Sequence, residues 1–294
     1  MATIETAFEQ VIAPVTHDLG DFKVNRTLPA RERTMVGPFI FVDEFGPARL
    51  PAGGGMDVRP HPHINLATVT YLFEGAIEHR DSIGSHAVIE PGAVNLMTAG
   101  SGIVHSERSP EGLRASGPSL YGMQTWLALP DGREEVEPAF DHVPADRLPV
   151  IEDSGVHARV LMGALWGAKA ATPQHSPTIY ADIELTGGSL PIEADADERA
   201  VMLVGGAAEL DGQPLELFTL YVLRPGHQAR LVSRAQDVEG EEIERLPVEF
   251  GLAADQHHRA LVGPAVDRDR SAGPQHDVGI DGRRMLGSRS FRTP

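Results

Sequence analysis

Two histidines stand two residues apart at the start of an alternating, β-branched run, HPHINLATVTYLFEG, which covers residues 61–75. In a β-strand, residues i and i+2 point to the same side, so His61 and His63 are predicted to share one face of a strand. If the strand is unbroken, alternate apolar residues follow on that face and line the interior of a barrel, as core or as part of a pocket. These residues are Ala67, Val69, Tyr71 and Phe73.

The segment GIVHSE contains a second pair with the same spacing, His105 and Glu107. Two antiparallel strands that carry such pairs would bring three imidazoles and one carboxylate together. Imidazole nitrogen and carboxylate oxygen both bind first-row metal ions, at about 2.0–2.2 Å. The two pairs therefore predict a metal centre. The alternative is that they are ordinary polar side chains at the ends of strands.

Other polar residues are interpreted as structural. The lone histidines are predicted to be hydrogen-bonded at turns, because none forms a His-x-His or His-x-Glu pair. The run from Glu78 to Asp81, EHRD, is a mixed charge cluster, which usually indicates an exposed hairpin. The lone histidines are His79, His86, His142, His157, His175 and His227.

The composition excludes several classes of protein. Of 294 residues, 41% are hydrophobic, 23% are charged and none is cysteine, so disulfides, cysteine zinc sites and a thiol nucleophile are absent. The net charge of −17 would repel a polyanion, so direct nucleic-acid binding is not expected. The first residues do not resemble a signal peptide, and no apolar stretch approaches the roughly 20 residues that span a bilayer. We therefore expect a cytoplasmic protein without a membrane partner.

Short apolar runs separated by Gly and Pro predict an all-β chain of sandwich or barrel type. Residues 131–149 are polar and acidic and are interpreted as a connector, after which strand-like runs resume. The tripeptide RPG at 224–226 repeats EPG at 90–92, each before an alternating segment, which hints at two similar barrels in tandem. Residues 256–294 have no clear period, and we expect this tail to be poorly ordered or irregularly packed.

The sequence around the two pairs resembles that of the pirin family, a branch of the bicupins. The similarity runs in order from about Arg26 to Pro130. It implies two tandem cupin, or jelly-roll, barrels: a metal-binding domain at 1–135, a domain without metal at 136–255, and an atypical tail at 256–294. The segments that carry the resemblance are RTMVGPFIFVDEFGP, HPHINLATVTYLFEG, GAIEHRDSIGS, PGAVNLMTAGSGIVHSE and YGMQTWLALP.

In proteins similar to this one, the first cupin binds one divalent metal, usually iron, through three histidines and one glutamate. Ala67 stands where many pirins have glutamate, which would make the pocket wall smaller and less acidic and would change substrate preference. The positions that match the ligand motif are His61, His63, His105 and Glu107.

The resemblance implies an iron-dependent dioxygenase that opens a flavonol such as quercetin with O₂, with Glu107 accepting the proton of the 3-hydroxyl group. A second hypothesis is a metal- and redox-dependent regulatory protein that binds a transcription factor or a metabolic enzyme. A third is a metal-free structural bicupin. A substrate-sized apolar cavity open to the metal would favour the enzyme, whereas a filled barrel beside a flat charged patch would favour the regulatory role.

Overall fold

The chain folds into β-strands with very little helix. The computed structural model describes residues 7–20, 22–233 and 247–253, all within one unit, Met1–Leu261. Within the described residues, the helices are the single turns α1 (Glu111–Arg114) and η1 (Ala145–Arg147), and neither could cross a bilayer. The prediction for the tail concerns residues 256–294, which lie outside the described residues.

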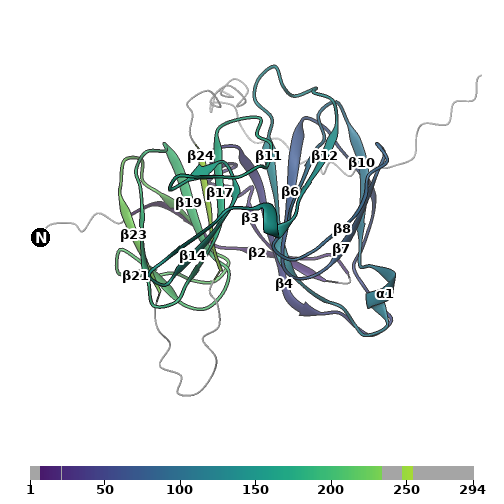
Figure 1. Cartoon of the computed structure of the whole chain (residues 1–294), viewed down its shortest axis with the longest axis horizontal. Helices are drawn as coiled ribbons and strands as arrows, with labels where there is room; N and C mark the ends of the chain where they lie inside the picture. The colour runs from purple at the N-terminus through teal and green to yellow at the C-terminus, as the bar shows by residue number, and fades with distance from the viewer. Residues whose placement is uncertain (1–6, 21, 234–246, 254–294) are drawn as a thin grey trace, which may run out of the picture. The chain divides into compact units, whose positions relative to one another are not determined.

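The first barrel consists of two antiparallel sheets (Figure 1). The larger has the strand order β12 (Ala139–Val143), β9 (Val94–Thr98), β6 (Leu66–Gly75), β11 (Ser119–Ala128), β4 (Phe39–Arg49), β3 (Lys23–Leu28) and β2 (Val15–Asp18). The smaller has the order β5 (Asp57–His63), β10 (Ile103–Arg108), β7 (Ile77–Asp81) and β8 (His86–Ile89).

The second barrel repeats this plan with the same numbers of strands. Its larger sheet has the order β1 (Phe8–Ile12), β22 (Leu220–Leu223), β19 (Glu198–Leu203), β24 (Pro247–Ala253), β17 (Thr178–Leu185), β14 (Val156–Met162) and β13 (Val150–Asp153). Its smaller sheet has the order β18 (Ser189–Ile192), β23 (Ala229–Ser233), β20 (Ala208–Leu210) and β21 (Gln213–Pro214). The hairpin of β15 (Ala164–Leu165) and β16 (Ala168–Lys169) is separate.

The two small sheets share one connectivity, in which the first strand pairs with the fourth, the fourth with the second and the second with the third. The prediction of an all-β fold with two tandem cupin barrels is therefore confirmed. In Figure 1, β24 lies between β17 and β19, the place that β11 takes between β6 and β4 in the first barrel.

Two strands belong to a different barrel from the strands that are next to them in the sequence. β1 belongs to the second barrel, where Phe8 pairs with Leu223, and β12 belongs to the first barrel, where Val143 pairs with Val94. Residues 131–149, predicted to be a connector, thus contain a strand of the first barrel as well as η1. We propose the boundary at 135 and 136 for the bulk of each barrel, with β1 and β12 exchanged across it.

The predicted face of β6 was wrong. The strand is broken after His63, because Asn65 has a left-handed φ of 62° and β6 continues in the other sheet. Thr70 therefore points into the first barrel, while Ala67 and Tyr71 face outward. The outward residues join a core to which both barrels contribute, including Val69, Leu96, Met123, Leu161, Tyr180 and Met202.

Glycine ends β6 for a steric reason. Gly75 has a φ of +90°, and a Cβ on it would lie 2.1 Å from the carbonyl oxygen of Ser119 on the neighbouring strand. Only glycine fits this backbone conformation and this close approach. The pairing of β6 with β11 depends on it, and β11 in turn carries residues of the cavity described below.

Candidate metal centre

Three imidazoles converge at the pairing of β5 and β10. His61 and His105 are direct cross-strand partners, and His63 follows two residues later on the same face of β5. The ring centroids are 4.4 Å apart for His61 and His105, 4.9 Å for His61 and His63, and 5.0 Å for His63 and His105. One ring nitrogen from each residue lies within 4.8 Å of the others. The local i, i+2 geometry and the strand register together produce this cluster.

Glu107 lies beside His105, one of the three imidazoles. The register of β10 against β5 shifts between His105 and Glu107, so that the Glu107 backbone pairs with Val58. Its buried carboxylate is held by Gln124, whose Nε2 donates to both oxygens at 3.0 and 3.2 Å. A Glu107 oxygen lies within 4.8 Å of ligand atoms of His105 and His79, and Glu107 lines the same cavity as His61.

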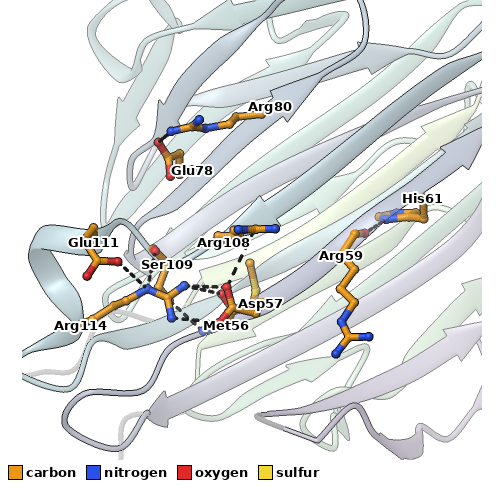
Figure 2. A network of polar contacts seen from close by, with 10 residues as sticks. All are labelled: Met56, Asp57, Arg59, His61, Glu78, Arg80, Arg108, Ser109, Glu111 and Arg114. Carbon is orange, nitrogen blue, oxygen red and sulfur yellow. Dashed lines mark hydrogen bonds and ion pairs between the residues drawn. The ribbon is translucent and has the colours of Figure 1, made fainter.

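The donor set fits a metal ion. His61 Nδ1 lies 2.9 Å from the carbonyl oxygen of Arg59, so this nitrogen carries the proton and Nε2 is left as the ligand atom (Figure 2). His105 Nε2 is buried and has no hydrogen-bond partner among the described residues. A buried polar atom without a partner is costly, and a metal ion would satisfy it. Three imidazoles and one carboxylate suit a first-row divalent ion.

The cluster opens onto a cavity of about 250 Å³ inside the first barrel. One wall is a stack in which Trp126 lies edge-on to His63 at 4.9 Å and face-to-face with Phe41 at 4.0 Å. The guanidinium of Arg26 lies 4.2 Å over the other side of the Phe41 ring and forms a bidentate pair with Asp43, at 2.7 Å for both bonds. Further lining residues include Phe22, Val24, Phe45, Met56, Val58, Thr70 and Ile77.

A polar network ties the start of β5 to the end of β10 (Figure 2). Arg114 donates to both oxygens of Asp57 at 2.9 and 2.7 Å, and its Nε donates to the carbonyl oxygen of Ser109 at 3.2 Å. Met56 N–H donates to Ser109 Oγ at 3.0 Å. These bonds hold together the two strands that carry the histidines, at the end away from His63.

Comparisons with known proteins give the family of the chain. A family model described as Pirin matches residues 21–127. A pirin-like protein of Caulobacter vibrioides is 50% identical over 214 residues, which are 71% of this chain and 74% of that protein. The chain belongs to the pirin family.

Solved structures of similar proteins extend the likeness of this pirin to both barrels. A quercetin 2,3-dioxygenase from Acinetobacter baumannii is 32% identical, with a TM-score of 0.74 over 84% of this chain and 79% of that one. A bacterial pirin from Escherichia coli in complex with nickel(II) is 18% identical, with a TM-score of 0.64 over 84% of this chain and 99% of that one, and shares the fold.

Burial lowers the pKa of two imidazoles of this pirin and so favours the neutral form that binds a metal ion. It lowers the pKa of His63 to about 4 and that of His105 to about 3, and the neighbouring His61 acts in the same direction on both. Both rings are therefore neutral at pH 7, the form that offers a lone pair to a metal. Burial also raises the pKa of Glu107, against the opposing effect of the Gln124 amide.

Two residues of the pirin site were missed by the sequence analysis. His79 and Asp81, predicted to lie in an exposed hairpin, are both turned inward from β7, and their side chains are 2% and 0% exposed. Glu78 stands before His79, and Arg80 stands between His79 and Asp81. Both face outward as predicted, and they form an ion pair at 2.8 Å (Figure 2). The i, i+2 spacing of His79 and Asp81 indicates that the two side chains share one face of a strand. It forms a His-x-Asp pair, which is neither of the pairs, His-x-His and His-x-Glu, on which the predicted metal site rests.

Ala67 was predicted to stand at the pocket wall of this pirin, and this prediction was also wrong. Ala67 is fully buried in the core between the barrels and does not line the cavity. The side chain of β6 that faces the cavity is Thr70. Position 67 therefore belongs to the packing between the barrels and not to the wall of the pocket.

Proposed function

We propose that this pirin is a metal-dependent dioxygenase that opens the ring of a flavonol such as quercetin with O₂, and that its metal is iron. The observation that carries the proposal is the unpartnered Nε2 of His105 beside His61 and His63, at an aromatic-walled cavity. The likeness to a quercetin 2,3-dioxygenase at 32% identity supports this substrate class. The nickel(II) complex of a pirin with the same fold supports a bound divalent metal.

In this proposal, His61, His63, His105 and Glu107 hold the ion. Bound there, the ion supplies Lewis acidity and a coordination position left open by four protein ligands. An imidazole ligand carries no negative charge, so Glu107 is the one anionic ligand. Gln124 fixes that carboxylate by donating to both of its oxygens.

Glu107 is the proposed base. It is the one carboxylate among the proposed ligands, and this makes it the acceptor for the proton of the flavonol 3-hydroxyl. The carboxylate lies on the cavity wall, where a bound ring can reach it. When one oxygen of Glu107 has taken the proton, the Gln124 amide can remain hydrogen-bonded to the other oxygen and so hold the carboxyl group at the cavity wall.

The aromatic wall is the proposed binding surface for the flat ring system. Trp126 and Phe41 are stacked at an interplanar angle of 10°, so together they present rigid apolar area at low entropic cost. A cavity of about 250 Å³ is close to the lower end of small-molecule sites, near 300 Å³. A cavity of this kind beside the imidazoles favours the enzyme over the regulatory hypothesis, which would suit a filled barrel.

The test is metal analysis paired with an aerobic assay of quercetin loss on iron-reconstituted protein. We expect one equivalent of iron and turnover in the wild type, and neither in the His61→Ala, His105→Ala double variant. His86→Ala is the matched control, since His86 is an exposed histidine on the same small sheet. A double variant with full metal content would refute the site, and iron without turnover would favour the regulatory role.

A further inference from the structure

A buried chain of hydrogen bonds runs from the metal centre across β7. His105 Nδ1 lies 3.4 Å from His79 Nδ1, and His79 Nε2 lies 3.0 Å from Asp81 Oδ2. The other Asp81 oxygen, Oδ1, accepts the backbone N–H groups of Ser85 at 2.8 Å and Ile83 at 3.1 Å. Nothing in the proposed chemistry uses His79 or Asp81, yet both are buried against the site.

The direction of each bond follows from the chemistry of its partner. A carboxylate only accepts, so His79 Nε2 carries the proton that Asp81 Oδ2 receives. In the neutral form of His79, Nδ1 then has the lone pair, and it accepts from His105 Nδ1–H. The proton of His105 is thereby placed on Nδ1, and its Nε2 is the bare, unpartnered nitrogen beside His61 and His63.

We propose that His79 and Asp81 are positioning residues, which fix the tautomer and ring orientation of His105 so that Nε2 is presented to the metal ion. The proposal rests on the metal-centre part of the proposed function and not on its substrate. Phe140 supports it by stacking on the His79 ring at 4.3 Å and 16°, which limits rotation of that ring. Partners of this kind orient ligand imidazoles and raise their basicity.

A competing role for His79 is that of a ligand. Ligand atoms of His79, His105 and Glu107 also lie within 4.8 Å of one another. As a ligand, however, His79 would have to bind through Nδ1, the nitrogen that faces His105 Nδ1, and the His105 Nδ1–H group would lose its acceptor. The experiment therefore includes the stoichiometry of bound metal.

The sharpest variant is Asp81→Asn. Two backbone N–H groups point at Oδ1 and require an oxygen there, so the new amide nitrogen must face His79. An N–H donor at that place forces the proton of His79 from Nε2 to Nδ1, where it points at His105. The His105 proton then moves to Nε2, the nitrogen needed by the metal, although no ligand has been replaced.

Two readouts are measured on the full chain with Zn²⁺ as the probe. One is the Kd for Zn²⁺ with the number of bound equivalents, and the other is ¹⁵N NMR of the histidine rings in metal-free protein, with His105 assigned from a His105→Asn variant. Glu78→Gln is the matched control, because it makes the same carboxylate-to-amide change on the outer face of β7. His79→Phe keeps a ring against Phe140 but removes both hydrogen bonds.

We expect Asp81→Asn and His79→Phe each to raise the Kd for Zn²⁺ about 10- to 100-fold and Glu78→Gln to leave it unchanged. In the His79→Phe background, Asp81→Asn should add nothing, because it acts through His79. The His105 proton should lie on Nδ1 in the wild type and on Nε2 in Asp81→Asn.

Three results would overturn the proposal. One is an unchanged Kd in Asp81→Asn, and another is a wild-type His105 that carries its proton on Nε2. The third is the loss of one whole equivalent of Zn²⁺ in His79→Phe, which would make His79 a ligand. None of these depends on flavonol turnover, and the NMR result needs no metal, so failure of the proposed dioxygenase activity is a separate outcome.

Discussion

Tyr71 of the first barrel donates a hydrogen bond of 2.7 Å to Asp182 of the second, and both side chains are buried. Arg159 Nη1 donates to the Tyr71 hydroxyl at 3.1 Å and lies 3.9 Å from Asp182 Oδ2. Burial is the largest influence on Asp182 and raises its pKa from 3.8 to about 6, in spite of the Tyr71 bond and the Arg159 charge. The contact between the barrels therefore contains a group that titrates under mildly acidic conditions.

This gives a prediction for stability against pH. The folded-state pKa of Asp182 lies above the unfolded value, so protonation stabilises the fold fully below about pH 4, and this contribution is lost as the pH rises through about 6. The loss amounts to about 3 kcal/mol. Urea unfolding at pH 4 to 7 should show this decline in the wild type relative to Asp182→Asn, which cannot ionise.

The control for this measurement is Asp153→Asn, an exposed carboxylate on β13 of the same barrel. Its stability curve should run parallel to that of the wild type across the range. If the Asp182→Asn curve also runs parallel to the wild type, the inter-barrel carboxyl does not titrate as described.

Replacement of Ala67 by glutamate should damage the fold and not tune the pocket. The position is fully buried between the barrels, and an unpaired carboxylate there would cost about 3 kcal/mol or more. Thermal unfolding should report the loss, and Ile64→Glu, at an exposed position three residues earlier, should be nearly neutral. A stable Ala67→Glu protein with an altered KM for flavonols would restore the pocket-wall interpretation.

Glu107→Gln tests the proposed base. An amide cannot take a proton at neutral pH, so we expect kcat for quercetin loss to fall about 100-fold or more, measured at saturating iron and normalised to bound metal. Glu74→Gln, the same change at the end of β6, should behave like the wild type. Equal kcat values per bound iron in Glu107→Gln and the wild type would remove Glu107 from proton transfer.

The two tryptophans offer a matched pair for the aromatic wall. Trp126→Leu removes the ring stacked on Phe41 and should raise the KM for quercetin several-fold, with a smaller effect on kcat. Trp166→Leu changes a tryptophan that is 40% exposed on the second barrel, and its kinetics should not change. Equal KM values in both variants would argue against ring binding at this wall.

The sequence predicts local geometry well and distant geometry poorly. His61 and His63 share a face because alternation along one strand is a short-range property, which spacing reveals. Their meeting with His105 depends in addition on the register of β10 against β5, which spacing does not give. Their role as ligands stays a prediction. The face of β6 was mispredicted because one left-handed residue, Asn65, interrupts the alternation, and periodicity in the sequence does not show such a break.

The exchange of β1 and β12 could not be predicted for a different reason. Whether a strand pairs with one barrel or the other is decided by which sheet edge is free in three dimensions, and both strands have ordinary strand sequences. The inward turn of His79 and Asp81 was predictable in principle, since β7 alternates as strictly as β5.

The pairing of β1 has a consequence for how the chain is made. β1 is synthesised before every other strand of its sheet, and its partner β22 follows roughly 200 residues later. At about 5–20 residues per second, β1 waits about 10 to 40 s without its sheet. Any nascent chain that ends before β22 carries an unpaired strand and an incomplete second barrel, both of which favour association between chains. The second barrel can therefore close only after β22 has been synthesised, and chaperones that hold β1 would act in that interval.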